Sequence, residues 1–259
     1  MPRPSPLRLP QSRPTAEVCC RHPAARPPYD WRVTNIDRRR FLALGVMLAA
    51  GCSTTRSGTG SGEGKLVGVP GSTLGSSRRA ITSVAMVGDS ITEGSKPVLT
   101  TTLTDAGVEE LRIEGKHSRR IEVGNGKGDA PLSGIITVYN LLAEGVDPDA
   151  WVIQLGTNDV GSYESAEQYG ELIDKITVML PEKPLVWVNT FRKQYLDDTI
   201  VFNTVLAERM KTRGDAAVAD WFTIASAPDE SVLRSDQLHP NDNGQLALSL
   251  LVLEALQQL

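Results

Sequence analysis

The fold is decided by the stretch ITSVAMVGDS, residues 81–90. Residues 81–87 form a short, mostly apolar run, which is typical of a strand buried on both faces of a sheet. Gly88 ends the run and lets the main chain turn sharply. Ser90 then falls near the start of a helix, where free N–H groups favour negative charge. The stretch therefore predicts a strand, a tight turn and a helix.

The rest of the domain alternates between short apolar runs and amphipathic stretches. We expect strands at residues 81–87, 111–113, 150–155, 184–188 and 216–221, and helices at 92–106, 132–143, 169–180, 199–210 and 243–259. This alternation predicts an α/β fold with a mainly parallel sheet covered by helices on both faces. In such sheets the site lies beyond the carboxyl ends of the strands, so the chemistry is expected in the loops that follow them.

The residues before this domain have a different composition. Residues 1–32 are crowded with Pro and Arg and lack apolar periodicity, which predicts a disordered segment or one placed upstream of the true start. Because export signals normally begin close to the initiator, we expect translation to begin near Val33. Residues 53–79 are rich in Gly, Ser and Thr and predict a flexible linker. The folded domain is then expected at residues 80–259.

Residues 33–52 have the features of an export signal. Arg38 and Arg39 precede an apolar run at 41–51, which is shorter than the roughly 20 residues needed to span a bilayer. The arginine pair resembles a twin-arginine signal. Ala49-Ala50-Gly51-Cys52 resembles a lipobox, whose cysteine is acylated and becomes the mature N-terminus. Chance clusters of Arg and of small residues are the alternatives. We expect an exported protein, lipid-anchored through Cys52 to the outer face of the bacterial cytoplasmic membrane.

Charge and cysteine content limit the chemistry of the domain. Residues 1–52 hold nine Arg and three acidic residues, which leaves 18 basic against 28 acidic residues, a net charge of −10, for the remainder. A nucleic-acid partner is therefore not expected. The three cysteines, Cys19, Cys20 and Cys52, all precede the domain, so it can form no internal disulfide. With so few His and no free Cys, we expect neither a metal site nor a cofactor. The oligomeric state stays open.

Three polar motifs each follow a predicted strand. Gly88-Asp89-Ser90 follows the first, and its serine is either a nucleophile or the N-cap of the next helix. Gly156-Thr157-Asn158-Asp159 follows the strand at 150–155, and Asn158 is either an oxyanion donor or a turn residue. Asp236-Gln237-Leu238-His239-Pro240 follows the last strand, and its spacing lets the carboxylate orient the imidazole. A lone surface histidine is the alternative there. Their order and placement together predict one catalytic site.

Residues 81–259 resemble the SGNH/GDSL hydrolase family. Gly88-Asp89-Ser90 matches its block I, Gly156-Thr157-Asn158-Asp159 its block III, and Asp236-x-x-His239-Pro240 its block V. The resemblance implies a three-layer αβα, flavodoxin-like fold with a parallel five-stranded sheet of order 2-1-3-4-5. It also implies a catalytic triad of Ser90, Asp236 and His239. The N–H of Ser90 and the side chain of Asn158 would then belong to the oxyanion hole.

The family's block II, whose glycine supplies another oxyanion N–H, is altered in this chain. By its place after the second strand, the matching segment is His117-Ser118-Arg119-Arg120, with Ser118 in the place of the glycine. Gly124, in the glycine-rich insertion at 123–128, is the alternative donor. Arg119 and Arg120 either contact an anionic substrate or form a solvated basic pair. Asn189, after the strand at 184–188, either lines the pocket or belongs to a turn.

The resemblance implies a serine esterase that forms an acyl-enzyme at Ser90 without any cofactor. Together with export, it suggests short acyl groups on cell-envelope glycans or lipids as substrates, with membrane contact through the lipid anchor only. The Ser-Arg-Arg stretch also resembles the extracellular domains of SGNH-type peptidoglycan O-acetyltransferases, so acyl transfer to an envelope sugar is an alternative. A non-catalytic envelope-binding module is the alternative from another class.

Overall fold

The predicted strands form one parallel sheet. The computed structural model describes residues 80–181, 183–228 and 231–259, so the predictions for residues 1–32, 33–52 and 53–79 lie outside the described residues. The elements are, in chain order, β1 (Ser83–Gly88), α1 (Ser90–Asp105), β2 (Glu110–Gly115), α2 (Gly134–Ala143), β3 (Ala150–Gln154), α3 (Ala166–Thr177), β4 (Leu185–Val188), η2 (Lys193–Tyr195), α4 (Leu196–Arg213), β5 (Ala216–Ala219), α5 (Trp221–Ala225) and α6 (Asp242–Gln257). The strand order β2-β1-β3-β4-β5, with every neighbouring pair parallel, confirms the predicted fold and order.

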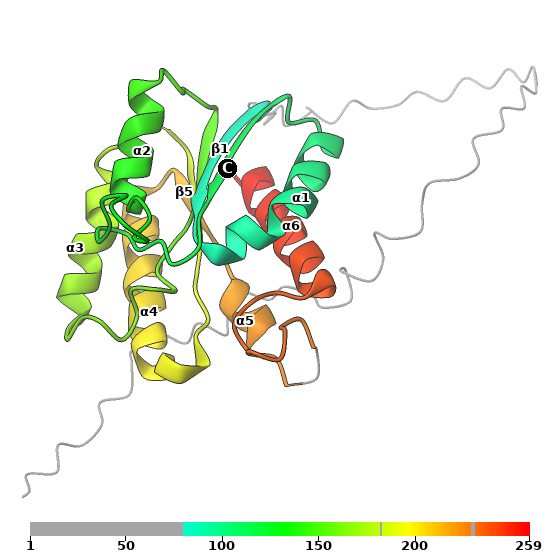
Figure 1. Ribbon diagram of the computed structural model, residues 1–259. Helices are drawn as coiled ribbons and strands as arrows, with labels where there is room; N and C mark the ends of the chain where they lie inside the picture. Colours follow the sequence, from blue (N-terminus) through cyan, green and yellow to red (C-terminus); the bar gives the residue numbers. More distant parts are fainter. Residues whose placement is uncertain (1–79, 182, 229–230) are drawn as a thin grey trace, which may run out of the picture. The chain divides into compact units, whose positions relative to one another are not determined.

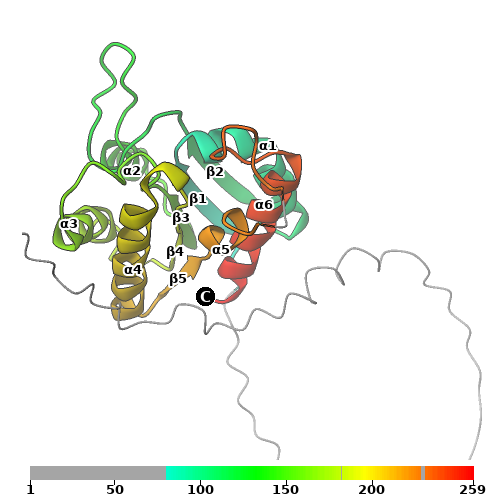
Figure 2. The same ribbon diagram turned by 90° about the horizontal axis from the view of Figure 1, so that it is seen from below.

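Helices cover both faces of the sheet. Figures 1 and 2 show α2, α3 and α4 on one side and α1, α5 and α6 on the other. Alternate residues of a strand point to opposite faces, so Val84 and Met86 pack with α1 and α6, while Ala85 and Val87 pack with α2, α3 and α4. Because both faces are covered, β1 is almost wholly buried, which explains its unbroken apolar run.

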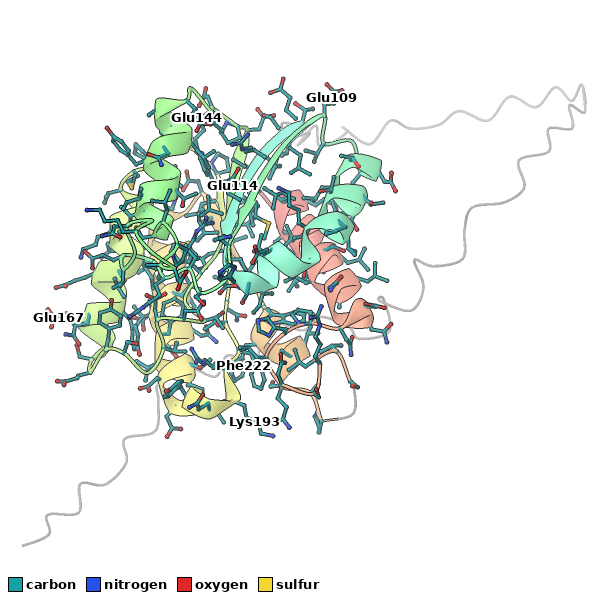
Figure 3. All side chains as sticks on the ribbon, in the orientation of Figure 1. Glu109, Glu114, Glu144, Glu167, Lys193 and Phe222 are labelled. Carbon is teal, nitrogen blue, oxygen red and sulfur yellow. The ribbon has the colours of Figure 1, made fainter. Side chains whose placement is uncertain are left out.

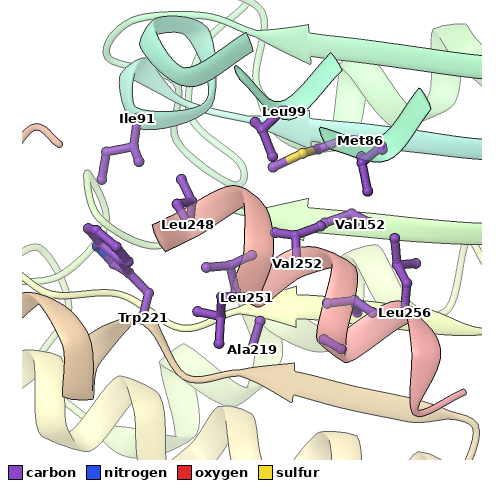
Figure 4. Close-up of a cluster of buried hydrophobic side chains, with 14 of the residues drawn as sticks. Met86, Ile91, Leu99, Val152, Ala219, Trp221, Leu248, Leu251, Val252 and Leu256 are labelled. Carbon is purple, nitrogen blue, oxygen red and sulfur yellow. The ribbon is translucent and has the colours of Figure 1, made fainter. Parts of the chain in front are cut away.

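The closing helix α6 is held firmly against the sheet. Its inward side chains enter the core beside Trp221, as Figure 4 shows: Leu248, Leu251, Val252 and Leu256. Full burial of each such leucine contributes roughly 2 kcal/mol. The segment that carries Asp236 and His239 leads directly into α6. The packing of α6 therefore fixes one end of that segment.

Most charged side chains lie on the outside of the domain, the buried Asp89, Arg119 and Asp159 being exceptions. Glu109, Glu144 and Glu167 are exposed, and Figure 3 shows them at the margins of the molecule. Within the described residues, no helix combines the length and apolar character needed to cross a membrane.

Most element boundaries differ from the prediction by a few residues, and two of them do so because an aspartate caps a helix. The first helix begins at Ser90 rather than Thr92, since the side chain of Asp89 accepts the N–H of Ile91 at 2.9 Å. The last strand ends at Ala219 rather than Trp221, since Asp220 caps the short helix α5 by accepting the N–H of Thr223. Trp221 continues the apolar pattern but belongs to that helix.

Candidate active site

The three polar motifs meet at the carboxyl edge of the sheet. β1 and β3 are neighbours, and Gly88 pairs with Gln154 at their ends. The loops of Ser90 and Asn158 therefore leave the sheet side by side, where the strand order reverses. The segment before α6 returns to this edge and brings His239 to Ser90.

Position 88, just before the nucleophile motif turns into α1, has room only for a glycine. A Cβ on Gly88 would lie 1.9 Å from Oγ1 of Thr92. Thr92 cannot give way easily, because it is buried and its hydroxyl donates to Oε1 of Gln154 at 2.8 Å. Asp89 supplies the N-cap of α1, so the alternative in which Ser90 caps this helix is wrong. The hydroxyl of Ser90 faces His239 instead.

A continuous line of polar contacts joins Asp236 to Ser90. Nε2 of His239 lies 2.9 Å from Oγ of Ser90, and Nδ1 of His239 lies 2.7 Å from Oδ2 of Asp236. Oδ1 of Asp236 accepts the N–H groups of Leu238 and His239, each at 3.0 Å. Burial raises the pKa of Asp236, but these hydrogen bonds outweigh it and lower the pKa from 3.8 to about 2. The ionised carboxylate favours a proton on Nδ1, which leaves Nε2 free to accept the proton of Ser90.

The segment that carries His239 is a narrow hairpin. Leu233 and Pro240 form an antiparallel bridge across it. The N–H of Arg234 donates to the carbonyl oxygen of His239 at 2.8 Å, and the N–H of Asn241 donates to that of Val232 at 3.0 Å. These bonds explain how an exposed loop holds the imidazole in place.

Ser118 has the main-chain conformation of a glycine. Its φ is +56°, in the left-handed region that side chains rarely adopt. The N–H of His117 donates to Glu93 at 2.7 Å, and that of Arg119 donates to the carbonyl oxygen of Lys116 at 3.2 Å. The N–H of Ser118 makes no hydrogen bond within residues 80–181, 183–228 and 231–259. It is therefore available to an oxyanion.

Gly124 has a structural reason for its own conformation. Its φ is +128°, and a Cβ there would lie 2.3 Å from the carbonyl oxygen of Pro131. Its carbonyl oxygen accepts the N–H of Ser133 at 3.2 Å, within the loop that leads to α2. The close approach of the two sides of this loop explains why residue 124 is a glycine. Of the two alternatives, the geometry favours Ser118 as the oxyanion donor.

The loop of Asn158 is tied to the loop of Ser118. Nδ2 of Asn158 donates to the carbonyl oxygen of Arg119 at 3.1 Å, which leaves a second amide N–H. Asp159, which is buried, accepts the N–H of Ile121 at 3.1 Å. Burial raises the pKa of Asp159 to about 6, although the N–H of Ile121 and the charge of Arg120 oppose it. Burial also raises the pKa of Asp89, beside the nucleophile, to about 6.

The structure contradicts both interpretations for Arg119. Arg119 is only 5% exposed, and its guanidinium donates to main-chain carbonyl oxygens. Arg120 lies 3.4 Å from Asp159 and over the ring of Tyr163. Arg119 is thus not solvated and its guanidinium is already engaged, whereas the side chain of Arg120 is 25% exposed and pairs with a buried carboxylate. No feature of the local sequence signals this burial, because the neighbouring residues are polar.

Asn189 has a different role from those expected. Its Oδ1 accepts the N–H of Phe222 at 2.7 Å, and its Nδ2 donates to Asp220 at 2.8 Å. The side chain is 7% exposed and joins the end of β4 to the start of α5. Asn189 therefore organises the scaffold.

A pocket of about 600 Å³ lies beside the Ser118 loop. Its lining is mostly polar or small and includes Lys116, His117, Gly126, Asp129, Pro131 and Leu132. The glycine-rich insertion at 123–128 forms part of one wall through Gly126 and Gly128. In the described part of the chain, no group of three or more His, Cys, Asp or Glu is arranged to hold a metal ion.

Comparisons with known proteins agree with this site and fold. Residues 86–247 match the GDSL-like lipase/acylhydrolase family. Three solved structures cover 68% of this chain: TesA (18% identity, TM-score 0.54, 98% of that chain), the lipase/acylhydrolase from Enterococcus faecalis (18%, 0.54, 96%) and a Clostridium thermocellum family 3 carbohydrate esterase (17%, 0.52, 96%). No curated protein matches. At these identities the structures show the fold alone, whereas the family match spans more than half of the chain. The protein therefore belongs to the GDSL-like lipase/acylhydrolase, or SGNH hydrolase, family and is a carboxylic ester hydrolase.

Proposed function

We propose that the protein removes short acyl groups from cell-envelope glycans or lipids through an acyl-enzyme at Ser90. The observation that carries the proposal is the line of contacts from Oδ2 of Asp236 through His239 to Oγ of Ser90, at 2.7 and 2.9 Å. A hydroxyl, a base and an orienting carboxylate in this arrangement are the parts that nucleophilic acyl transfer needs.

In the proposed mechanism, Nε2 of His239 takes the proton of Ser90 while Oγ attacks the ester carbonyl. The N–H groups of Ser90 and Ser118 and the amide of Asn158 bind the oxyanion. Removing one such donor typically costs about 3 kcal/mol of transition-state stabilisation. The C–O bond to the alcohol then breaks, and His239 gives its proton to the departing oxygen. Water, deprotonated by His239, attacks the acyl-enzyme. The bond to Oγ of Ser90 then breaks, Oγ takes back a proton from His239, and the acid is released. Asp236 stays ionised throughout, since its pKa is near 2.

The pocket beside the Ser118 loop, whose lining does not include Ser90, Asn158 or His239, offers hydrogen-bonding groups near the site. A long acyl chain needs apolar walls. In this pocket Lys116, His117 and Asp129 can form hydrogen bonds with sugar hydroxyls, beside the short apolar wall of Ala130, Pro131 and Leu132. We therefore favour O-acetyl and similar short groups on sugars. One solved structure of the same fold is named a carbohydrate esterase, which supports the same substrate class.

Water is the acceptor that the site favours. The side chains of His239 and Asp236 are 32% and 47% exposed, so water has access to the imidazole that activates it. The alternative is transfer of the acyl group to a sugar hydroxyl, which takes the place of water. An experiment with an added acceptor distinguishes hydrolysis from transfer. Formation of acylated sugar when a glycan acceptor is added would indicate a transferase.

We also propose that the enzyme works at the outer face of the bacterial cytoplasmic membrane, anchored through acyl groups on Cys52. This proposal rests on the sequence of residues 33–52. Labelled palmitate should enter the wild-type protein but not Cys52→Ser, which should appear outside the membrane fraction. Equal labelling of both proteins would contradict the anchor.

The test of the catalytic proposal is hydrolysis of p-nitrophenyl esters of increasing chain length. We expect the acetate to react fastest, and Ser90→Ala to lose at least about 10³-fold in kcat while keeping its fold. Ser95→Ala is the matched control, because Ser95 lies in the same helix, is buried, and makes no hydrogen bond through its hydroxyl to any residue that the structure describes. Equal background rates in wild type and Ser90→Ala would favour the binding module. A preference for long chains would contradict the substrate class.

A further inference from the structure

We infer that Arg119 is a positioning residue that assembles the oxyanion hole by holding the loop of Ser118 against the loops of Ser90 and Asn158. The inference rests on the proposed function for the roles of those three residues. Arg119 itself contacts neither the hydroxyl of Ser90 nor the imidazole of His239 among the described interactions. Its contribution is therefore to geometry and not to the reacting atoms.

The guanidinium of Arg119 joins three separate segments of main chain. Nη1 donates to the carbonyl oxygen of Gly88 at 2.9 Å and to that of Glu114, and Nε donates to that of Leu132 at 3.1 Å. Gly88 ends β1, Glu114 lies near the end of β2, and Leu132 precedes α2. No carboxylate forms an ion pair with Arg119 in the part of the chain that the structure describes. A buried cation bound only to carbonyl oxygens is costly to desolvate, which indicates a specific role.

The main chain of Arg119 completes the connection. Its carbonyl oxygen accepts the amide of Asn158 at 3.1 Å, and its N–H closes the turn onto Lys116 at 3.2 Å. Ser118, at φ +56°, lies inside that turn. The residue thus touches the nucleophile loop through Gly88 and the Asn158 loop through its own carbonyl oxygen. Loss of the guanidinium would remove its bonds to the ends of β1 and β2 and to the segment before α2, and would leave the Ser118 loop held by main-chain bonds such as the one to Asn158.

The arrangement requires arginine rather than another cation. The planar guanidinium presents several N–H groups in fixed directions, whereas a lysine ammonium is a compact charge on a flexible stem. Lysine would keep the charge but could not bond the carbonyl oxygens of Gly88, Glu114 and Leu132 together. We therefore expect Arg119→Lys to recover only part of the activity lost in Arg119→Met.

The experiment compares kcat and KM for p-nitrophenyl acetate in Arg119→Met, Arg119→Lys and wild type. Loss of one aligned oxyanion donor lowers kcat by about 10²-fold, and we expect this fall in Arg119→Met with KM changed by less than about threefold. Arg209→Met is the matched control, since Arg209 pairs with Asp174 at 3.0 Å between α4 and α3, away from these loops. It should keep its kcat. A folded Arg119→Met with kcat within about threefold of wild type overturns the inference.

A boronic acid gives a readout that a purely structural role would not change. Oγ of Ser90 gives its proton to Nε2 of His239 and adds to the empty orbital of boron without any bond breaking at boron, and the tetrahedral anion that forms needs the oxyanion donors. In Arg119→Met the inhibition constant should rise in proportion to the fall in kcat, and an unchanged constant overturns the inference. If wild type shows no Ser90-dependent hydrolysis, the proposed function fails separately. Hydrogen exchange at the main-chain amides of residues 116–121 then decides alone. Faster exchange in Arg119→Met than in Arg209→Met supports the inference, and equal exchange in the two variants overturns it.

Discussion

Replacing Asp236 by Asn tests the tautomer that the site imposes on His239. Oδ1 of Asp236 accepts two main-chain N–H groups at 3.0 Å, from Leu238 and His239, while Oδ2 faces Nδ1 of the imidazole at 2.7 Å. Asparagine has one acceptor oxygen, and the two N–H groups hold it in the place of Oδ1. Its NH₂ group then faces Nδ1, which must accept a hydrogen bond. The ring proton moves to Nε2, the nitrogen that should take the proton of Ser90.

Asp236→Asn should lower kcat strongly while changing the free energy of unfolding only slightly. Holding a catalytic histidine in the wrong tautomer lowers kcat by about 10³–10⁴-fold. A pKa lowered from 3.8 to about 2 corresponds to at most roughly 2.5 kcal/mol of stability, and because the side chain is 47% exposed we expect about 1 kcal/mol or less. Since the folded-state pKa is lowered, this contribution is present above about pH 4 and is lost as the pH falls toward 2. At neutral pH, Asp236→Asn should therefore be folded and nearly inactive.

Steady-state hydrolysis of p-nitrophenyl acetate at neutral pH, with circular dichroism to confirm folding, measures the effect. Asp242→Asn is the matched control, because Asp242 is an exposed carboxylate in the first turn of α6 and removing it deletes the same charge nearby. We expect the control to keep its kcat. A folded Asp236→Asn that retains more than about a tenth of wild-type kcat would refute the tautomer argument.

Two further predictions concern the oxyanion loop and the sheet edge. Ser118→Gly should keep kcat within about threefold, because the N–H is the expected donor and glycine readily adopts a φ of +56°; a large fall in kcat with the same ester would assign the role to the hydroxyl. Asp149→Asn should lower the free energy of unfolding by about 1 kcal/mol at neutral pH, because hydrogen bonds from Thr82 and Ser83 hold the pKa of Asp149 at about 2. Urea denaturation should show that difference roughly halved near pH 3, and an undiminished difference there would contradict the assignment.

The sheet and the outline of the site could be predicted because local pattern and tertiary placement agree. The run at residues 81–87 is apolar without interruption, since helices cover both faces of the sheet. Ser90 and Asn158 follow β1 and β3, which are neighbours, so the crevice rule brings their loops together. His239 comes from a distant segment, and only the motif it shares with Asp236 indicated that it would reach them.

The role of Arg119 could not be predicted, because its partners are carbonyl oxygens that the fold brings together from three segments. A main-chain acceptor has no signature in the sequence, so a polar Ser-Arg-Arg stretch is easily taken for a surface. The prediction that Trp221 ends a strand was wrong for a related reason. Its apolar side chain fits a strand, but the cap made by Asp220 starts a helix there. In both cases a hydrogen bond to the main chain decided the structure against the local hydrophobic pattern.

The central claim is tested most directly by trapping the covalent intermediate. Brief reaction with p-nitrophenyl acetate, an acid quench and peptide mass mapping locate any acetyl group on the protein. The account predicts one acetyl group, on Ser90, in the wild-type enzyme and none in Ser90→Ala. An acetyl group on another residue, or turnover by Ser90→Ala at the wild-type rate, would contradict it.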